Sequence, residues 1–218
     1  MRHNSYICDK LQCPQITMPI SSRQPLTSHI QGTAEEGFKK IVTGNGEAFL
    51  FGPTQARHAD AVVELIQSSH DNGGGALPLT REQVLAMAKG GHSFIAIDPA
   101  TNSVVGHQAI GVWPGCYELR SGVTHPGYRG KGINTAMKSA FIIHIFEESP
   151  GAVIIAIKSG EMGLGALTNG FGFREEPLEE AQSKYLFGIL KPEEGPWHVY
   201  SLTQQSLIRA PIQSALRD

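Results

Sequence analysis

The amino-acid sequence predicts an α+β domain built on a mixed, mostly antiparallel central sheet. Three strand-like segments follow one another between residues 92 and 124, and adjacent strands of this kind favour antiparallel pairing. A single strand–loop–helix–strand segment over residues 116–158 predicts one parallel crossover. The length of 218 residues suits one medium-sized domain with an appendage, and a composition of 40% hydrophobic and 17% charged residues is typical of a globular chain.

Residues 1–45 differ from the rest of the chain. Prolines and many Ser, Thr and Gln residues interrupt any periodicity there, apart from a short helical stretch expected over residues 34–42. Cys8 and Cys13 lack a second Cys/His pair at ligand spacing, so we predict no metal site. We expect an N-terminal extension over residues 1–45 and the domain proper over residues 46–218.

The pattern becomes regular in the next part of the chain. Residues 47–52 are apolar and predict a strand that ends at a Gly-Pro pair. Thr54 is expected to cap a helix that runs to about Ser69, because apolar residues follow at helical spacing. A glycine-rich loop separates this helix from a second one, in which Thr80 and Gln83 have the spacing of a capping box.

The remaining elements follow from apolar runs bounded by turn residues. Strands are expected over residues 92–98, 103–113, 116–124, 152–158, 171–176 and 197–202. Helices are expected over residues 133–147 and 163–170. The run at residues 152–158 is continuously apolar, which is typical of a strand buried on both faces.

A glycine-rich, cationic turn, THPGYRGKGINTAMK over residues 124–138, leads directly into the longest predicted helix. The first N–H groups of a helix have no internal partners and the helix dipole favours negative charge there, so this turn predicts an anion-binding site. A Walker A loop is excluded, because no Gly-Lys-Ser/Thr occurs. A dinucleotide-binding fingerprint fails as well, because Thr135 stands where its third glycine would be.

The stretch from Arg129 to Asn134, RGKGIN, resembles the pyrophosphate-binding signature Arg/Gln-x-x-Gly-x-Gly/Ala of the GNAT superfamily of acyl-CoA N-acyltransferases. The resemblance extends over about residues 47–203, through the element order and through a Gly172-Phe173 ending after the last short helix. It implies a GNAT-like sheet with helices on both faces. It also implies that acetyl-CoA lies in a V-shaped splay between two central strands.

The resemblance further implies which residues hold the cofactor. Backbone groups of two strand residues would pair with the pantetheine arm, and N–H groups of the glycine loop would surround the pyrophosphate. The implied cofactor-binding residues are Val123, Thr124, Arg129, Gly130, Lys131, Gly132, Ile133, Asn134 and Thr135. A backbone N–H near Val123 would hold the oxyanion of the tetrahedral intermediate.

The sequence departs from the family pattern at the group that protonates the leaving thiolate. Thr168 stands where the family places a Tyr, and Glu161 stands near the position of a common Asn. Tyr185 or a water would have to substitute, or the step proceeds without assistance.

Acetylation of an amine requires that a base first removes a proton from an ammonium with a pKa near ~10. Glu118 is the first candidate, because a Glu at about this strand position serves as base in several GNAT members. Alternation along a strand would place Glu118 on one face with Arg120 and Thr124, although an exposed Glu paired with Arg120 is the alternative interpretation. His107 is the second candidate, against the alternative of a structural histidine.

These observations predict an acetyl-CoA-dependent N-acetyltransferase that transfers an acetyl group directly to the amine of a small molecule or amino acid. The alternative is a catalytically degenerate acyl-CoA-binding sensor or scaffold. A net charge of −2 argues against a general nucleic-acid binder, and no apolar run approaches the ~20 residues that span a bilayer. An odd number of cysteines without a secretory signal favours the cytoplasm. A C-terminal strand at a sheet edge would allow a homodimer.

Overall fold

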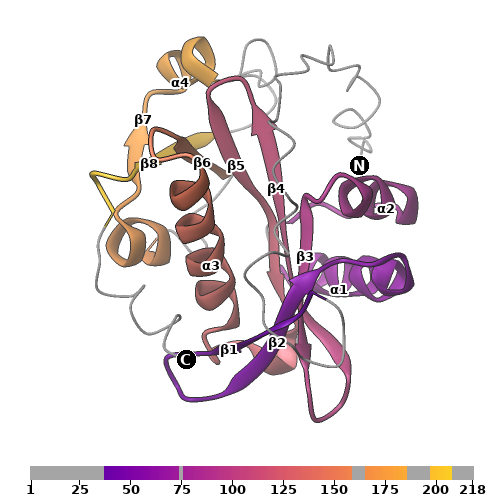
Figure 1. Cartoon of the computed structure of the whole chain (residues 1–218). Coiled ribbons are helices and arrows are strands. Elements are labelled where there is room, and N and C mark those ends of the chain that lie inside the picture. The colour runs from indigo at the N-terminus through magenta and orange to yellow at the C-terminus, as the bar shows by residue number, and fades with distance from the viewer. Residues whose placement is uncertain (1–36, 74–75, 159–164, 186–196, 208–218) are drawn as a thin grey trace.

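The computed structural model describes residues 37–73, 76–158, 165–185 and 197–207. In these residues the chain forms an eight-stranded sheet with the strand order β1-β2-β3-β4-β5-β6-β8-β7 (Figure 1). The strands are β1 Lys39–Val42, β2 Ala48–Pro53, β3 Ser93–Asp98, β4 Ser103–Trp113, β5 Cys116–Thr124, β6 Val153–Lys158, β7 Arg174–Glu176 and β8 His198–Thr203. Every neighbouring pair is antiparallel except β5 and β6, which confirms the predicted mixed sheet with one parallel crossover.

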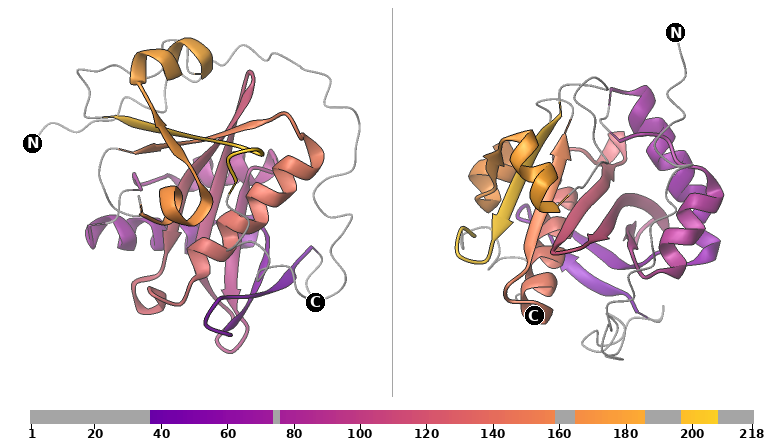
Figure 2. Two further views of the ribbon diagram at one scale, coloured as in Figure 1. Left: turned by 90° about the vertical axis from the view of Figure 1, so that its left-hand side faces the viewer. Right: turned by 90° about the horizontal axis from the view of Figure 1, so that it is seen from above.

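Helices cover both faces of the sheet (Figures 1 and 2). The helices are α1 Ala59–Asp71, α2 Arg81–Lys89, α3 Ile133–Glu148 and α4 Leu178–Tyr185, with shorter turns at η2 Ala56–His58, η3 Pro126–Tyr128 and the π-helix η4 Ala166–Phe171. α1 and α2 pack on one face, and α3 and η4 pack on the other. Ala181 of α4 contacts Ile155 and Val199, on the face opposite α3.

The core consists of one apolar layer on each face of the sheet. On the α3 side, the rings of Phe51, Phe94 and Phe141 contact one another with centroids 4.7 to 5.8 Å apart. On the other side, Ile66 of α1 packs in a cluster with Ile95 of β3. Full burial of a side chain of this size contributes about 1.5–3 kcal/mol, so β3, β4 and β5 are held firmly between the two helical layers.

Local sequence signals fixed several elements correctly. β4 and β5 coincide with the predicted strands, and the predicted capping box of α2 is present. Gln83 N–H donates to Thr80 Oγ1 at 3.3 Å, and Thr80 N–H donates to Gln83 Oε1 at 2.7 Å. The predicted cap at Thr54 is wrong, because this side chain is buried against the sheet and bonds Ser93 Oγ at 2.7 Å. Gln55 is the N-cap of η2, and His58 is the N-cap of α1.

The helix expected over residues 34–42 is wrong in its described part. Residues Lys39–Val42 form β1, which pairs with β2, and Phe38 immediately before it is fully buried. The alternation of buried and exposed side chains along this stretch has period two, because Ile41 faces the core and its neighbours do not. The sheet therefore includes residues that precede the boundary expected at residue 46.

The C-terminal part of the fold differs from the prediction in two further ways. α4 was not predicted, because three of its eight residues are charged and only Ala181 is buried. β8 lies between β6 and β7, so the expectation that the C-terminal strand forms an edge is wrong. Among the described strands, the edges are β1 and β7.

β5 carries a bulge near its end. Ala109 pairs with Arg120 and His107 pairs with Val123, so three steps along β5 oppose two steps along β4. Ser121 has a φ of 47°, in the left-handed region. Because of the extra residue, side chains on the two sides of the bulge exchange faces: Leu119 packs toward α3, whereas Val123 packs beneath α1.

The bulge corrects the expectation that Glu118 and Thr124 share one face of the sheet. Glu118 follows the alternation set by Leu119 and faces the α1 and α2 side. Thr124 follows Val123 and faces the α3 side. Strand periodicity alone could not predict this, because one inserted residue reverses every assignment beyond it.

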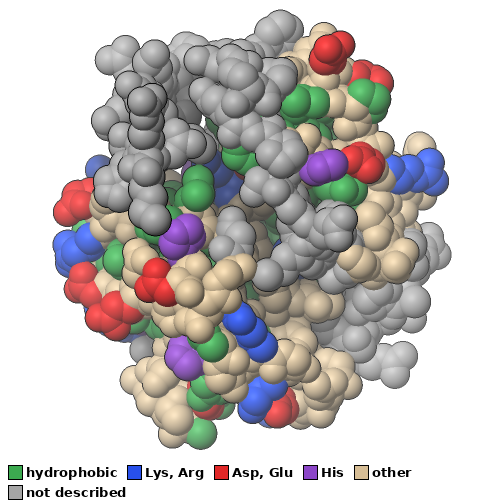
Figure 3. Space-filling view, turned by 180° about the vertical axis from the view of Figure 1, so that it is seen from behind, with side chains coloured by type: hydrophobic (Ala, Val, Ile, Leu, Met, Phe, Trp, Pro, Cys, Tyr) green, Lys and Arg blue, Asp and Glu red, His purple; other side chains and the backbone are tan. Residues whose placement is uncertain are grey.

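The surface of the described residues carries mixed charge. In the view from behind, Lys and Arg side chains lie among Asp and Glu side chains, and neither sign gathers into a large patch on the part of that face that the structure describes (Figure 3). None of the described helices combines the length and the apolar character that a membrane span requires.

Candidate active site

The central sheet opens between β5 and β6. These strands are paired at only three positions, Cys116 with Val153, Tyr117 with Ile154 and Glu118 with Ile155, although β5 continues to Thr124. Beyond Glu118, the edge of β5 that faces β6 has no strand partner among the residues that the structure describes. Backbone N–H and C=O groups seek hydrogen bonds, so this edge is ready to pair with an extended ligand.

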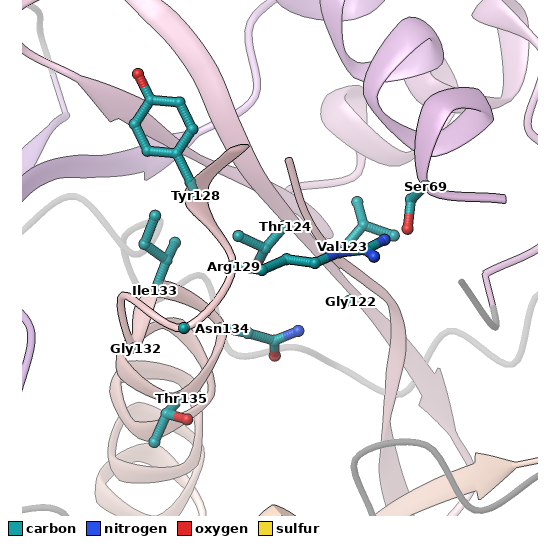
Figure 4. Close-up of a pocket in the computed structure, with 11 residues that line it drawn as sticks. Ser69, Gly122, Val123, Thr124, Tyr128, Arg129, Gly132, Ile133, Asn134 and Thr135 are labelled. Carbon is teal, nitrogen blue, oxygen red and sulfur yellow. The ribbon is translucent and has the colours of Figure 1, made fainter. Parts of the chain in front are cut away.

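A hollow of about 450 Å³ lies at this opening (Figure 4). Its walls come from the end of β5, from the glycine loop, from the first turn of α3 and from one residue of α1. The lining residues are Gly122, Val123, Thr124, Tyr128, Arg129, Gly130, Gly132, Ile133, Asn134, Thr135 and Ser69. The structure thus brings together eight of the nine residues that the sequence assigned to the cofactor, all except Lys131.

The glycine loop has the backbone geometry of an anion site. Gly130 and Gly132 both have a φ of 80°, which side-chain-bearing residues rarely adopt, and Gly132 is the N-cap of α3. The first hydrogen bond into the helix runs from Ala136 N–H to Gly132 O at 2.9 Å. The N–H groups of the preceding helical residues have no intrahelical acceptor and lie at the positive end of the helix dipole, beside the hollow.

Lys131 turns away from the hollow. Its ammonium lies 3.0 Å from the Glu47 carboxylate and 5.1 Å from the centre of the Tyr128 ring. Asn45 Nδ2 donates to Gly130 O at 3.0 Å, so the turn between β1 and β2 supports the loop at two points. Sequence reasoning missed this support, because nothing local links residues 43–47 to a loop more than eighty positions later.

Glu118 stands where the sheet begins to open, on the side of α1 and α2, and it is not one of the residues that line the hollow. It is 9% exposed, and Trp113 Nε1–H donates to its Oε2 at 2.8 Å. Burial raises the pKa of this carboxyl, while the Arg120 guanidinium 3.5 Å away and the Trp113 hydrogen bond lower it. The Arg120 contact of the alternative interpretation is therefore present, but the carboxylate is largely buried rather than exposed.

His107 lies inside the sheet layer and does not line the hollow. It is 1% exposed, with Nδ1 3.1 Å from Ser121 O and Nε2 3.0 Å from Ser93 Oγ. Burial lowers its pKa to about 4, so the imidazole is neutral at pH 7. Both ring nitrogens are engaged within the protein, which favours the structural interpretation of this residue over a role as base.

The candidates for protonating a leaving thiolate also lie outside the hollow. Thr168 is part of η4, and Tyr185 ends α4 and packs against the cluster around Cys116, where burial raises the pKa of its phenol. Tyr128 does line the hollow, but its hydroxyl donates to Asp98 Oδ2 at 2.6 Å. Glu161 lies outside the described residues.

Metal-ligating side chains do not converge in the described part of the chain, where no group of three or more His, Cys, Asp or Glu residues has a suitable arrangement. Cys8 and Cys13 lie outside that part. Cys116 is a free, buried thiol whose pKa burial raises to about 12, so it is not an activated nucleophile.

Comparison with known proteins assigns the fold. No protein-family model matches the sequence, and no curated protein does. An acetyltransferase of the GNAT family from Bacillus anthracis superposes with a TM-score of 0.53 at 21% identity, over 76% of this chain and 99% of that one. RimJ of Mycobacterium smegmatis in complex with CoA-disulfide superposes with a TM-score of 0.59 at 17% identity, over 81% of this chain and 91% of that one. The ribosomal-protein-S18-alanine N-acetyltransferase of Escherichia coli superposes with a TM-score of 0.51 at 13% identity, over 69% of this chain and 89% of that one.

A mixed sheet that opens beside a glycine loop at a helix N-terminus is the arrangement that the sequence resemblance implied. The chain has the GNAT fold, as the sequence resemblance predicted.

Proposed function

We propose that this chain is an acetyl-CoA-dependent N-acetyltransferase, which transfers an acetyl group directly to the amine of a small molecule or amino acid. The observation that carries the proposal is the edge of β5 beyond Glu118, which no described strand pairs with and which ends at a glycine loop with an anion-binding geometry. An acyl-CoA has both matching parts: a pantetheine arm with amide groups and a pyrophosphate.

The residues around the hollow fit this ligand. The backbone of Val123 and Thr124 offers hydrogen bonds to an extended arm, in the manner of an added strand. Thr124 Oγ1 is buried and has no hydrogen-bond partner among the described residues, as expected for a group that bonds a ligand. The first-turn N–H groups of α3 and the Arg129 side chain, which lines the hollow, supply the charge complementarity for phosphate.

Glu118 supplies the base in this proposal. Its carboxylate removes a proton from the acceptor ammonium, directly or through a water, and the raised pKa of a buried carboxyl brings it closer to that of the amine. The neutral nitrogen then bonds to the thioester carbonyl carbon, the C–S bond breaks, and the nitrogen gives up its second proton to water. Water relays this proton to the thiolate of CoA. A backbone N–H at the β5 bulge, near Val123, stabilises the oxyanion.

The setting of the proposed reaction is the cytoplasm. Cys116 is a free thiol, and free thiols are typical of a reducing compartment. The proposal requires neither a metal ion nor a nucleic-acid partner.

The alternative proposal is a catalytically inactive acyl-CoA sensor or scaffold. It is favoured by Thr168, which replaces the Tyr that the family uses as general acid. A chain of this kind would bind acetyl-CoA in the same hollow but would not release CoA faster when an amine is added.

A thiol-release assay on the full chain separates these proposals. Acetyl-CoA is incubated with amino acids, polyamines and short peptides in turn; peptides belong in the panel because one protein of the same fold is a ribosomal-protein-S18-alanine N-acetyltransferase. We expect one class of small amine to raise CoA release well above the rate of hydrolysis. Binding without amine-dependent release would support the sensor, and release only with peptides would contradict the small-molecule acceptor.

A further inference from the structure

The β5 bulge is held from both faces of the sheet by two consecutive residues of β4. On the α1 side, His107 Nδ1 lies 3.1 Å from Ser121 O. On the α3 side, Gln108 Nε2 donates to Arg120 O at 2.7 Å. These carbonyls belong to the two residues that precede Gly122, where the lining of the hollow begins.

The direction of the hydrogen bonds at His107 follows from chemistry. A carbonyl oxygen only accepts, so Nδ1 carries the ring proton and donates to Ser121 O. The ring is neutral at pH 7, so Nε2 accepts from Ser93 Oγ–H at 3.0 Å. The Ser93 proton is then committed, and Thr54 Oγ1–H must donate to Ser93 Oγ at 2.7 Å.

This buried relay connects three parts of the fold. Thr54 lies just before the turn that leads into α1, Ser93 begins β3, and both are nearly fully buried, as is His107. A buried hydrogen-bonded chain is costly to break, because each group that loses its partner stays away from water. The relay thus fixes the carbonyl of Ser121, a non-glycine residue in the left-handed region whose conformation needs support from its surroundings.

Gln108 completes the arrangement from the opposite face. Its amide nitrogen also donates to Ala109 O at 3.1 Å, so the orientation of the amide is fixed and Oε1 points toward Gly122. A Cβ atom on Gly122 would lie 2.6 Å from Gln108 Oε1, which is buried without a partner among the described residues. A larger residue at position 122 would therefore displace the Gln108 amide.

We propose that His107 and Gln108 are positioning residues for acyl-CoA, because they hold the bulge that aligns the backbone of residues 122–124 with the hollow. The proposal rests on the proposed function, since acyl-CoA is the ligand that uses this edge. Without the bulge, the alternation of β5 would continue unbroken, and the side chains of Val123 and Thr124 would exchange faces.

The test uses two substitutions of His107, each of which keeps only one of its two hydrogen bonds. In His107→Asn, the amide nitrogen occupies the position of Nδ1 and still donates to Ser121 O. In His107→Gln, the amide lies at the position of Nε2 and reaches only Ser93. Ile97→Ala removes buried volume in β3, on the same face of the sheet as His107, and serves as a control for general destabilisation. Thermal unfolding measures the loss of stability in all three variants.

Calorimetry with two ligands gives a readout that a general loss of stability would not produce. CoA reaches both the glycine loop and the bulge, whereas adenosine 3′,5′-bisphosphate lacks the pantetheine arm. We expect His107→Gln to weaken CoA binding by about tenfold, as for a lost buried hydrogen bond, and to leave bisphosphate binding within about twofold. His107→Asn and Ile97→Ala should bind both ligands within about threefold of the wild type.

Hydrogen–deuterium exchange of the ligand-free protein reports the bulge independently. We expect faster exchange at residues 121–124 in His107→Gln than in His107→Asn. Unchanged exchange, unchanged CoA affinity, or an equal loss for both ligands would each overturn the positioning role. If the wild-type chain binds neither ligand, the proposed function and the role in acyl-CoA binding both fail, while the exchange result still decides whether His107 holds the bulge.

Discussion

Glu118 and Ile155 form the last registered pair between β5 and β6, so the candidate base stands at the point where the sheet opens. Beyond this pair, no described strand lies along this edge of β5, and a few residues later β5 reaches the hollow beside α3. A carboxylate at the closed end of the opening and an anion site at its mouth are the two ends of the proposed acyl-CoA site.

The first prediction concerns the pH dependence of Glu118. Glu118→Gln should lower kcat about a hundredfold or more with little change in acetyl-CoA affinity, because a general base contributes on this order. The defect should shrink as pH rises toward the pKa of the acceptor amine. Rate measurements from pH 5 to 10 test this, and a defect of constant size across that range would point to a structural role instead.

The acid limb of the wild-type profile gives a second prediction. Only the carboxylate form of Glu118 can accept a proton, so activity falls as pH drops through its pKa. Burial raises that pKa, which places the limb at a higher pH than for an ordinary carboxyl, and the Arg120 cation opposes the shift. Arg120→Gln should therefore move the limb to still higher pH. A limb that stays in place or moves lower would mean that Arg120 does not act on the titrating group.

Arg129 and Lys131 should differ in their contribution to cofactor binding. Arg129 lines the hollow, and its replacement by Ala should weaken acetyl-CoA binding by about 1.5–3 kcal/mol, as for a charged hydrogen bond. Lys131 is paired with Glu47 on the surface, and exposed pairs contribute at most about 1 kcal/mol. Calorimetry on both Ala variants compares them directly, and an equal or larger loss at Lys131 would contradict the assignment of the loop.

Gly132 should tolerate no larger residue. At a φ of 80°, the Cβ atom of Gly132→Val would lie 3.4 Å from Thr43 Cβ, so strain in the loop adds to any effect on the phosphate. A left-handed conformation costs a side-chain-bearing residue about 1–2 kcal/mol. We expect a loss of stability of this order and weaker acetyl-CoA binding. Gly151→Val, at a position with open space and no positive φ, is the matched control and should bind as the wild type does.

The alternating strands and the capping box were predictable because their signals are local. The features that the sequence did not predict depend on contacts between distant segments. β1 was assigned to a helix, because the burial of Phe38 against Gly52 is visible only once the sheet is assembled. The bulge at Ser121 depends on His107, fourteen residues earlier, and no periodicity in β5 reports it. The glycine loop is one local segment, so its residues were expected to lie together, whereas the direction of the Lys131 side chain depends on Glu47, a distant residue.

Calorimetric titration of the full-length chain with acetyl-CoA tests the central claim most directly. The account predicts saturable binding of one acetyl-CoA per chain, which Arg129→Ala weakens and Gly151→Val does not. A folded protein that shows no saturable binding at about millimolar ligand, far weaker than the micromolar range of typical KM values, would contradict it.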